Sequence, residues 1–378
     1  MCLKNFKKES FGMSNPTVNI EKLDQYMALK PVNEDGLTYY SPFEKPFRLA
    51  GSLFQAQHGT IFRRIPAEPE INPRVSELAN YTAGFQVQFK STSCRVSIKV
   101  KLRHGEIMQH MPQTGSSSFD LYVGGPGAWR AVRSAAFPLH AKEFSAELYN
   151  RPEKNWREYL LNFPLYNGVE ELWIGLEENS KLEAPSEFSG RDLVIYGTSI
   201  TQGGCASRPG MAWSNILSRR LNRQIFNFGF SGNGRGEVQM AEFIARVQNP
   251  GAFVLDYEAN AQYEGIKNTL EDFIAVLRKH HPQVPITVIS RAPDGNLMAA
   301  FGTNDDLDKT HPESAESCEF QLALVNRLRA AGDRNIYFID GRKLLGLDWD
   351  ECLVDGCHFT DLGFYRMAEN LSKYLVFN

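Results

Sequence analysis

The spacing of the hydrophobic residues in this 378-residue chain changes partway along it, and that change constrains the fold most. Over residues 38–182, short runs alternate apolar and polar residues, and Gly, Pro, Asn and Ser separate these runs. Alternation with period two is typical of half-buried strands, and several such runs in succession predict a β-sandwich. Over residues 183–191 the composition becomes polar and turn-forming, so we expect the domain boundary here.

Beyond that boundary, apolar strand-like runs alternate with helical ones. Five strand-like runs occur, at residues 192–197, 224–229, 252–257, 285–290 and 335–340. This alternation predicts a parallel sheet covered by helices on both faces, which is a three-layer α/β/α domain. Such sheets bind ligands beyond the carboxyl ends of their strands, so the residues that follow each strand are the candidates for chemistry. The predicted parts are an N-terminal extension (1–37), a sandwich domain (38–186) and an α/β domain (187–378).

Charge and hydropathy exclude several classes of protein. The 41 basic and 44 acidic residues give a net charge of −3, which argues against a nucleic-acid-binding protein held by electrostatics. The apolar runs are strand-sized, so we expect no membrane-spanning helix.

No secretory signal is visible at the N-terminus, so we expect a cytoplasmic protein unless a leader has been trimmed. The six cysteines lack C-x-x-C spacing, and we expect free thiols, no metal and no other cofactor.

Polar residues follow the first three strands of the predicted parallel sheet. Ser199 lies on a turn between a strand and a helix, where a serine exposes its hydroxyl, although a helix cap is commoner than a nucleophile when such a segment stands alone. Gly232 belongs to a glycine-rich segment whose backbone N–H groups could approach an oxyanion; the alternative is a flexible loop. Asn260 could donate its amide to the same oxyanion or could serve as a turn residue.

A carboxylate and an imidazole occur close together near the C-terminus. The spacing of Asp355 and His358 lets the carboxylate orient the imidazole and support the imidazolium formed during proton transfer. The alternative is a polar loop before the last helix, in which Thr360 or Asp361 acts as the cap.

Together these segments resemble the SGNH (GDSL-type) hydrolase family. Gly197-Thr198-Ser199-Ile200-Thr201 is similar to its first block, with Thr198 in place of the usual Asp, and Ser231-Gly232, Asn260 and Asp355-x-x-His358 match later blocks. The resemblance covers residues 191–378. The family's third block usually reads G-x-N-D, and Glu258-Ala259-Asn260-Ala261 keeps only its Asn. A literal match, Gly302-Thr303-Asn304-Asp305, lies deep in a long loop, so we prefer Asn260 to Asn304 as the third-block asparagine.

The resemblance extends to a subgroup with an N-terminal β-sandwich that carries a G-x-D-L-Y motif. Residues 118–122 read Ser-Phe-Asp-Leu-Tyr, with Ser118 in place of Gly. The resemblance implies a flavodoxin-like α/β/α domain preceded by a jelly-roll-like sandwich. It also implies acyl transfer in which Ser199 attacks, His358 moves the proton and Asp355 orients His358. The N–H groups of Ser199 and Gly232, with the amide of Asn260, would hold the oxyanion.

The residues around this site are assigned less specifically. Cys205, Arg208 and Trp213 follow the nucleophile and are candidates for lining a substrate pocket, although helix packing is the preferred explanation for Trp213. We read Cys357 as a small buried filler and His110 as a surface or loop histidine.

The expected substrate is a carboxylic ester, either a small molecule or a glycan, with O-acetyl groups on carbohydrates as the leading hypothesis. Two alternatives remain open at this point. One is a lipase-like or thioesterase-like acylhydrolase that acts on small lipid esters. The other is a non-catalytic glycan-binding protein with a degenerate hydrolase domain. The sequence leaves the oligomeric state open.

Overall fold

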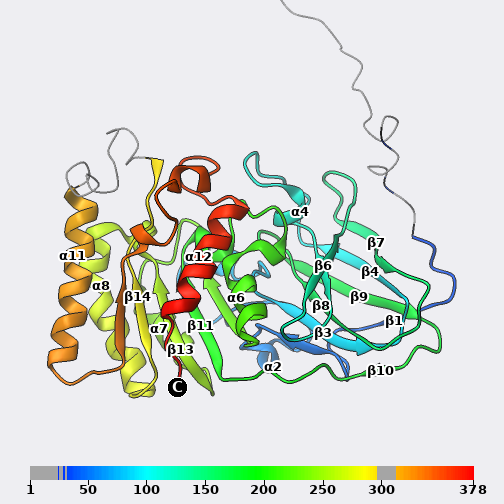
Figure 1. Cartoon of the computed structure of the whole chain (residues 1–378), viewed down its shortest axis with the longest axis horizontal. Helices are drawn as coiled ribbons and strands as arrows, with labels where there is room; N and C mark the ends of the chain where they lie inside the picture. The colour runs from blue at the N-terminus through cyan, green and yellow to red at the C-terminus, as the bar shows by residue number, and fades with distance from the viewer. Residues whose placement is uncertain (1–23, 25–28, 30–31, 296–311) are drawn as a thin grey trace, which may run out of the picture. The chain divides into compact units, whose positions relative to one another are not determined.

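Two antiparallel sheets form the first half of the chain (Figure 1). One has the order β1 (Leu37–Tyr40), β9 (Val169–Glu177), β4 (Arg95–Leu102), β7 (Glu143–Asn150). The other has the order β10 (Leu182–Glu183), β3 (Gln86–Ser91), β8 (Arg157–Asn162), β5 (Asp120–Val123), β6 (Arg130–Ser134), and β2 (Arg48–Ala50) also pairs with β3. Inward side chains of both sheets, such as Ile98 and Phe89, belong to one buried cluster, as period-two strands require.

A five-stranded parallel sheet follows. Its order is β12 (Ile225–Gly229), β11 (Asp192–Gly197), β13 (Pro250–Asp256), β14 (Ile286–Ile289), β15 (Ile336–Ile339). In order along the chain this is 2-1-3-4-5, which is the flavodoxin-like arrangement, and it confirms the predicted α/β fold. The antiparallel strands end with β10 and the parallel sheet begins with β11, on either side of residues 184–191.

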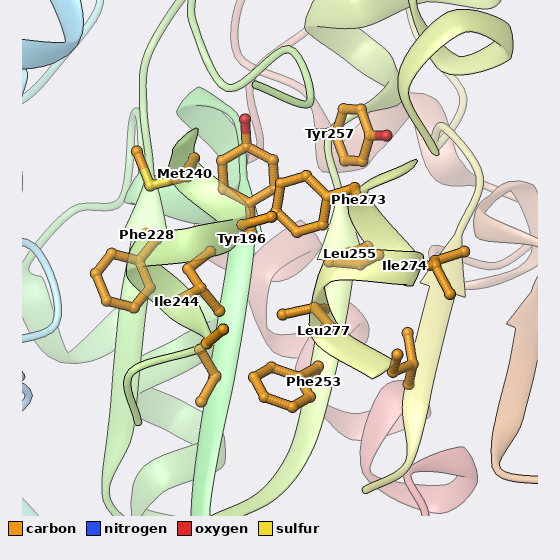
Figure 2. Close-up of a cluster of buried hydrophobic side chains, with 14 of the residues drawn as sticks. Tyr196, Phe228, Met240, Ile244, Phe253, Leu255, Tyr257, Phe273, Ile274 and Leu277 are labelled. Carbon is orange, nitrogen blue, oxygen red and sulfur yellow. The ribbon is translucent and has the colours of Figure 1, made fainter. Parts of the chain in front are cut away.

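Helices cover both faces of the parallel sheet, and the alternation of side chains along each strand explains how. In β11, Val194 and Tyr196 face one cluster while Leu193 and Ile195 face the other. The first cluster, part of which Figure 2 shows, also contains side chains of α7 (Val238–Ile244), α8 (Glu258–His280) and α11 (Pro312–Ala330). The second contains side chains of α6 (Trp213–Leu221) and α12 (Asp361–Tyr374).

This computed structural model describes residues 24, 29, 32–295 and 312–378. Residues 32–378 form one compact unit. Most of the predicted N-terminal extension, and Asn304 with its loop, lie outside the described residues. In the described ranges, no helix is both long and apolar enough to span a bilayer.

Short elements connect the sheets to the residues of interest. They are α2 (Gln55–His58), α3 (Pro73–Leu78), α4 (Gln113–Ser116), α5 (Ser199–Gln202) and three 3₁₀ turns, η1 (Pro209–Met211), η3 (Gly341–Lys343) and η4 (Trp349–Cys352). Because α5 begins directly after β11, its first residue lies at the carboxyl edge of the sheet. This edge includes the point between β11 and β13 where the strand order reverses, which is where parallel sheets bind ligands.

Candidate active site

Ser199 is the first residue of α5 and follows strand β11 after a single residue. The helix cap is Thr198, whose hydroxyl accepts a hydrogen bond from the main-chain N–H of Ile200 at 3.3 Å. Thr198 can therefore fill the position that usually holds Asp in this pattern, since a threonine caps a helix well. The hydroxyl of Ser199 is left available, and the residue is 7% exposed.

Asp355 and His358 lie in the loop between η4 and α12, and His358 reaches Ser199. The Nε2 atom of His358 lies 3.0 Å from Oγ of Ser199, and its Nδ1 atom lies 2.7 Å from Oδ2 of Asp355. The other oxygen of Asp355 accepts hydrogen bonds from the main-chain N–H groups of His358 and Cys357, at 2.8 and 3.1 Å. Burial acts to raise the pKa of Asp355, but the hydrogen bonds outweigh it and hold the pKa below its ordinary value. The carboxylate is therefore ionised and fixed against the imidazole.

The glycine-rich segment after β12 contributes a free backbone donor. Gly232 has φ +65°, a left-handed conformation that favours glycine. The N–H of Ser231 donates to Oε1 of Gln202 at 3.0 Å, so it is already used. Among the described residues, the N–H groups of Ser199 and Gly232 have no hydrogen-bond acceptor. They remain available to a ligand.

Asn260 lies in the first turn of α8 and contacts the same segment. Its Nδ2 atom donates to the carbonyl oxygen of Phe230 at 3.3 Å and to that of Asn233. The structure thus brings Asn260 to the Gly232 segment, where it braces the backbone. To donate to an oxyanion as well, the amide would have to break one of these two hydrogen bonds. The bond to the Phe230 carbonyl oxygen is the longer of the two.

Residues of the sandwich domain pack directly against Ser199 and its helix. The hydroxyl of Tyr166 donates to the main-chain oxygen of Ser199 at 3.2 Å, and Gln202 of α5 donates to the carbonyl oxygen of Leu165 at 3.0 Å. A Cβ atom on Gly204 would lie 2.8 Å from the Tyr166 hydroxyl and 3.2 Å from Cδ2 of His358. Because the Tyr166 hydroxyl and the His358 ring are this close, a side chain at position 204 would displace them, which favours glycine.

The Ser118–Tyr122 motif holds the segment that follows α5. Asp120 is 1% exposed, and its Oδ2 atom accepts hydrogen bonds from Arg208 at 2.7 Å and from the main-chain N–H of Gly210 at 2.9 Å. Its Oδ1 atom accepts from Asn162 at 2.7 Å. Arg208 also donates to the hydroxyl of Tyr122. The guanidinium of Arg208, predicted to line a pocket, is therefore engaged in joining the two domains.

The other two predicted pocket residues differ from each other. Trp213 is fully buried in the cluster under α6 and α12, as the packing explanation expects, and its indole nitrogen has no partner within residues 32–295 and 312–378. Cys205 is 6% exposed and has φ +72°. Burial, with the nearby Asp355 carboxylate, raises the pKa of Cys205 to about 12, and burial raises the pKa of the half-buried Cys357. Neither thiol has the low pKa of a nucleophilic cysteine.

Sequence reasoning missed Arg64, which supports the glycine-rich segment from outside the α/β domain. Arg64 is 1% exposed, and its guanidinium donates to the carbonyl oxygens of Gly229 at 2.5 Å and Leu78 at 2.8 Å. It also stacks 4.4 Å from the ring centroid of Phe230. Burial lowers its pKa to about 9. No local pattern marks Arg64, because its partners lie far along the chain.

Sequence reasoning also assigned His110 only to a loop or the surface. It does lie in a loop, between β4 and α4, but the centroid of its ring is 5.5 Å from that of His358. His110, Cys205, Asp355 and His358 each bring one potential metal-ligand atom into a group whose atoms all lie within 4.8 Å of one another. Nothing in the sequence indicated this group, because the tertiary fold assembles it from three separate segments.

The fold and site together define a class of protein: an α/β/α domain with a Ser–His–Asp chain of hydrogen bonds at the carboxyl edge of its sheet. Residues 190–376 match the model of the GDSL-like lipase/acylhydrolase family, and residues 37–182 match that of the N-terminus of Esterase_SGNH_hydro-type proteins. The chain belongs to the GDSL-like (SGNH) family, and it is a carboxylic ester hydrolase.

Solved structures agree with this assignment. A GDSL-like lipase from Bacteroides ovatus is 29% identical, with a TM-score of 0.79 over 89% of this chain and 96% of the other. Two further structures show the fold alone. The salicylyl-acyltransferase SsfX3 is 17% identical, with a TM-score of 0.71 over 90% and 97% of the two chains. A family two carbohydrate esterase from Clostridium thermocellum is 16% identical, with a TM-score of 0.53 over 77% and 91%. A search of curated proteins gives no match.

Proposed function

We propose that the chain hydrolyses carboxylic esters through an acyl-enzyme formed on Ser199. The observation that carries this proposal is the unbroken hydrogen-bond chain from Asp355 through His358 to Ser199. His358 removes the proton of the Ser199 hydroxyl as its oxygen attacks the ester carbonyl, and returns that proton to the leaving alcohol. Asp355 holds the ring in the tautomer that presents Nε2 to Ser199 and stabilises the imidazolium.

The tetrahedral oxyanion would bind the free N–H groups of Ser199 and Gly232. Each such donor typically contributes about 3–4 kcal/mol of transition-state stabilisation. Asn260 would either join them or, through its bonds to the carbonyls of Phe230 and Asn233, keep Gly232 in place. Water then attacks the acyl-enzyme with His358 as the base, and Ser199 is released.

For the substrate, we propose short acyl esters, with O-acetyl groups of carbohydrates first among them. Tyr166, Met111 and His358 lie close around Gly204, and this crowding beside His358 supports a short acyl group. The similarity in fold to carbohydrate esterases supports a glycan as the alcohol part.

The test compares Ser199→Ala with Ser189→Ala, which removes an exposed serine hydroxyl elsewhere. We expect Ser199→Ala to abolish both p-nitrophenyl acetate hydrolysis and fluorophosphonate labelling, and Ser189→Ala to retain both. Unchanged activity of Ser199→Ala would refute the nucleophile. An unlabelled, inactive wild-type chain would favour a non-catalytic glycan-binding protein.

A second comparison tests the substrate. Acetate release from acetylated xylan and acetylated monosaccharides is measured beside hydrolysis of long-chain esters. We expect acetate release to be faster. Preference for the long-chain esters would favour the lipid acylhydrolase instead, and cleavage of neither would refute the substrate proposal while leaving the nucleophile intact.

A further inference from the structure

Three separate segments bring four metal-ligating side chains together beside Ser199. His110 comes from the loop between β4 and α4, Cys205 from the turn after α5, and Asp355 and His358 from the loop before α12. One ligand atom from each lies within 4.8 Å of the others. The burial is graded: Cys205 is buried, the two histidines are half-buried and Asp355 is exposed, so the group is open to solvent on one side.

The donor set selects a class of cation. Two imidazoles and a thiol are ligands that Zn²⁺ and similar borderline ions prefer, whereas Mg²⁺ and Ca²⁺ take oxygen ligands. Because Zn–N and Zn–S bonds measure about 2.0–2.3 Å, tetrahedral ligand atoms lie roughly 3.3–3.8 Å apart. The four atoms lie within 4.8 Å of one another, which exceeds these separations by at most about 1.0–1.5 Å, so a small inward movement of one side chain would suffice.

His110 is free to make that movement. Among the described residues, no hydrogen bond engages either nitrogen of its ring, and its ring faces that of His358 at a tilt of 40°. The other members are already fixed. Cys205 is held by its buried, left-handed backbone, and His358 is held by its Nδ1 bond to Asp355.

The hydrogen bonds of His358 also decide which of its atoms is available. Since Nδ1 is bonded to the carboxylate of Asp355, Nε2 is the atom left for a cation, and Asp355 then stands behind the ring as the orienting carboxylate common at metal sites. Nε2 is the atom that contacts Oγ of Ser199 at 3.0 Å. Nε2 therefore cannot bind a cation and accept the proton of the Ser199 hydroxyl at the same time.

We propose that a borderline divalent cation, Zn²⁺ or Co²⁺, binds His110, Cys205 and His358, and that it inhibits the enzyme by taking His358 away from Ser199. Binding forms a metal–sulfur bond, and the proton of the Cys205 thiol passes to solvent. Three protein ligands leave the fourth position to water. The binding itself does not depend on the proposed function; only the inhibition rests on it.

The binding test uses the untagged, full-length, metal-free chain titrated with Co²⁺, whose thiolate complexes absorb in the near ultraviolet. We expect wild type to give a sulfur-to-cobalt band, Cys205→Ser to lose it and Cys357→Ser to keep it. We expect His110→Ala to weaken cobalt binding at least about tenfold. His280→Ala, at a surface histidine that pairs with Glu242, should bind as wild type does. Absence of the band in wild type, or equal affinities for His110→Ala and His280→Ala, would overturn the site.

The inhibition test measures hydrolysis of p-nitrophenyl acetate against Zn²⁺ concentration. We expect the half-inhibitory concentration to rise at least about tenfold in His110→Ala and to stay unchanged in His280→Ala. Cobalt binding without inhibition of an active enzyme would overturn the competition for His358. If the proposed function fails and the chain has no esterase activity, the cobalt band still reports the site, so the two failures are distinguishable.

Discussion

The bond between Asp120 and Arg208 should couple the stability of the sandwich to the activity of the α/β domain. Asp120 lies on β5 of the sandwich, and Arg208 lies between α5, which begins at Ser199, and η1. The Asp120 side chain is 1% exposed, that of Arg208 is 26% exposed, and the charged atoms lie 2.7 Å apart. Removal of the carboxylate would leave the N–H of Gly210 without its acceptor, and the guanidinium of Arg208 would keep only the Tyr122 hydroxyl and the Met211 sulfur.

The magnitude follows from this burial. Removing one partner of a fully buried ion pair costs about 3–5 kcal/mol. Because a quarter of the Arg208 side chain is exposed, water recovers part of that cost, and we expect about 2–3 kcal/mol for Asp120→Asn. The asparagine amide would also point a donor toward atoms that are themselves donors. Arg208→Gln should cost about 1–3 kcal/mol, because it leaves Asp120 buried with only two of its three donors.

A double-mutant cycle measures the pair. Urea unfolding of wild type, Asp120→Asn, Arg208→Gln and the double variant, followed by circular dichroism and tryptophan fluorescence, should give a coupling free energy of about 1–3 kcal/mol. We also expect kcat/KM for p-nitrophenyl acetate to fall roughly tenfold or more in Asp120→Asn, since small displacements of a site are costly. Additive single effects, or a stability change below about 0.5 kcal/mol, would refute the reasoning.

Three further predictions follow from buried groups. Arg64→Met should lower the free energy of unfolding in urea by about 2–4 kcal/mol, because it removes the hydrogen-bond donors of the Gly229 and Leu78 carbonyl oxygens. A change below about 0.5 kcal/mol would show that these carbonyls need no donor. Burial raises the pKa of Asp256 from 3.8 to about 7, so the folded state holds its proton more tightly and stability falls as pH rises between these values. At pH 8, Asp256→Asn should therefore raise the free energy of unfolding relative to wild type, by at most about 4 kcal/mol, and at pH 4 it should give no such gain. Equal effects at both pH values would contradict this. Trp213→Phe should leave KM unchanged and cost about 1–3 kcal/mol, since no described hydrogen bond of the indole nitrogen is lost but the smaller ring leaves a cavity at a fully buried site; a raised KM would restore Trp213 to the substrate pocket.

The sequence was sufficient for features that depend on neighbouring residues. The change from period two to alternating strands and helices predicted both halves of the fold, because side-chain burial along a strand or helix repeats with its local geometry. The start of α5 at Ser199 and the pairing of Asp355 with His358 are also local: one depends on a strand-to-helix turn, the other on a spacing of three residues.

Only the tertiary structure decided which distant residues meet at this site. Arg64 supports the Gly232 segment, His110 faces His358, and Arg208 is bound by Asp120, yet each partner lies far away along the chain. Spacing in sequence carries no information about such contacts, because they form only where the two domains pack against each other. Trp213 is likewise buried by residues distant along the chain, and within the α/β domain the amide of Asn260 donates to the carbonyl oxygens of Phe230 and Asn233. The sequence by itself thus determined the order of the elements and the local catalytic candidates, while packing between domains determined what surrounds them.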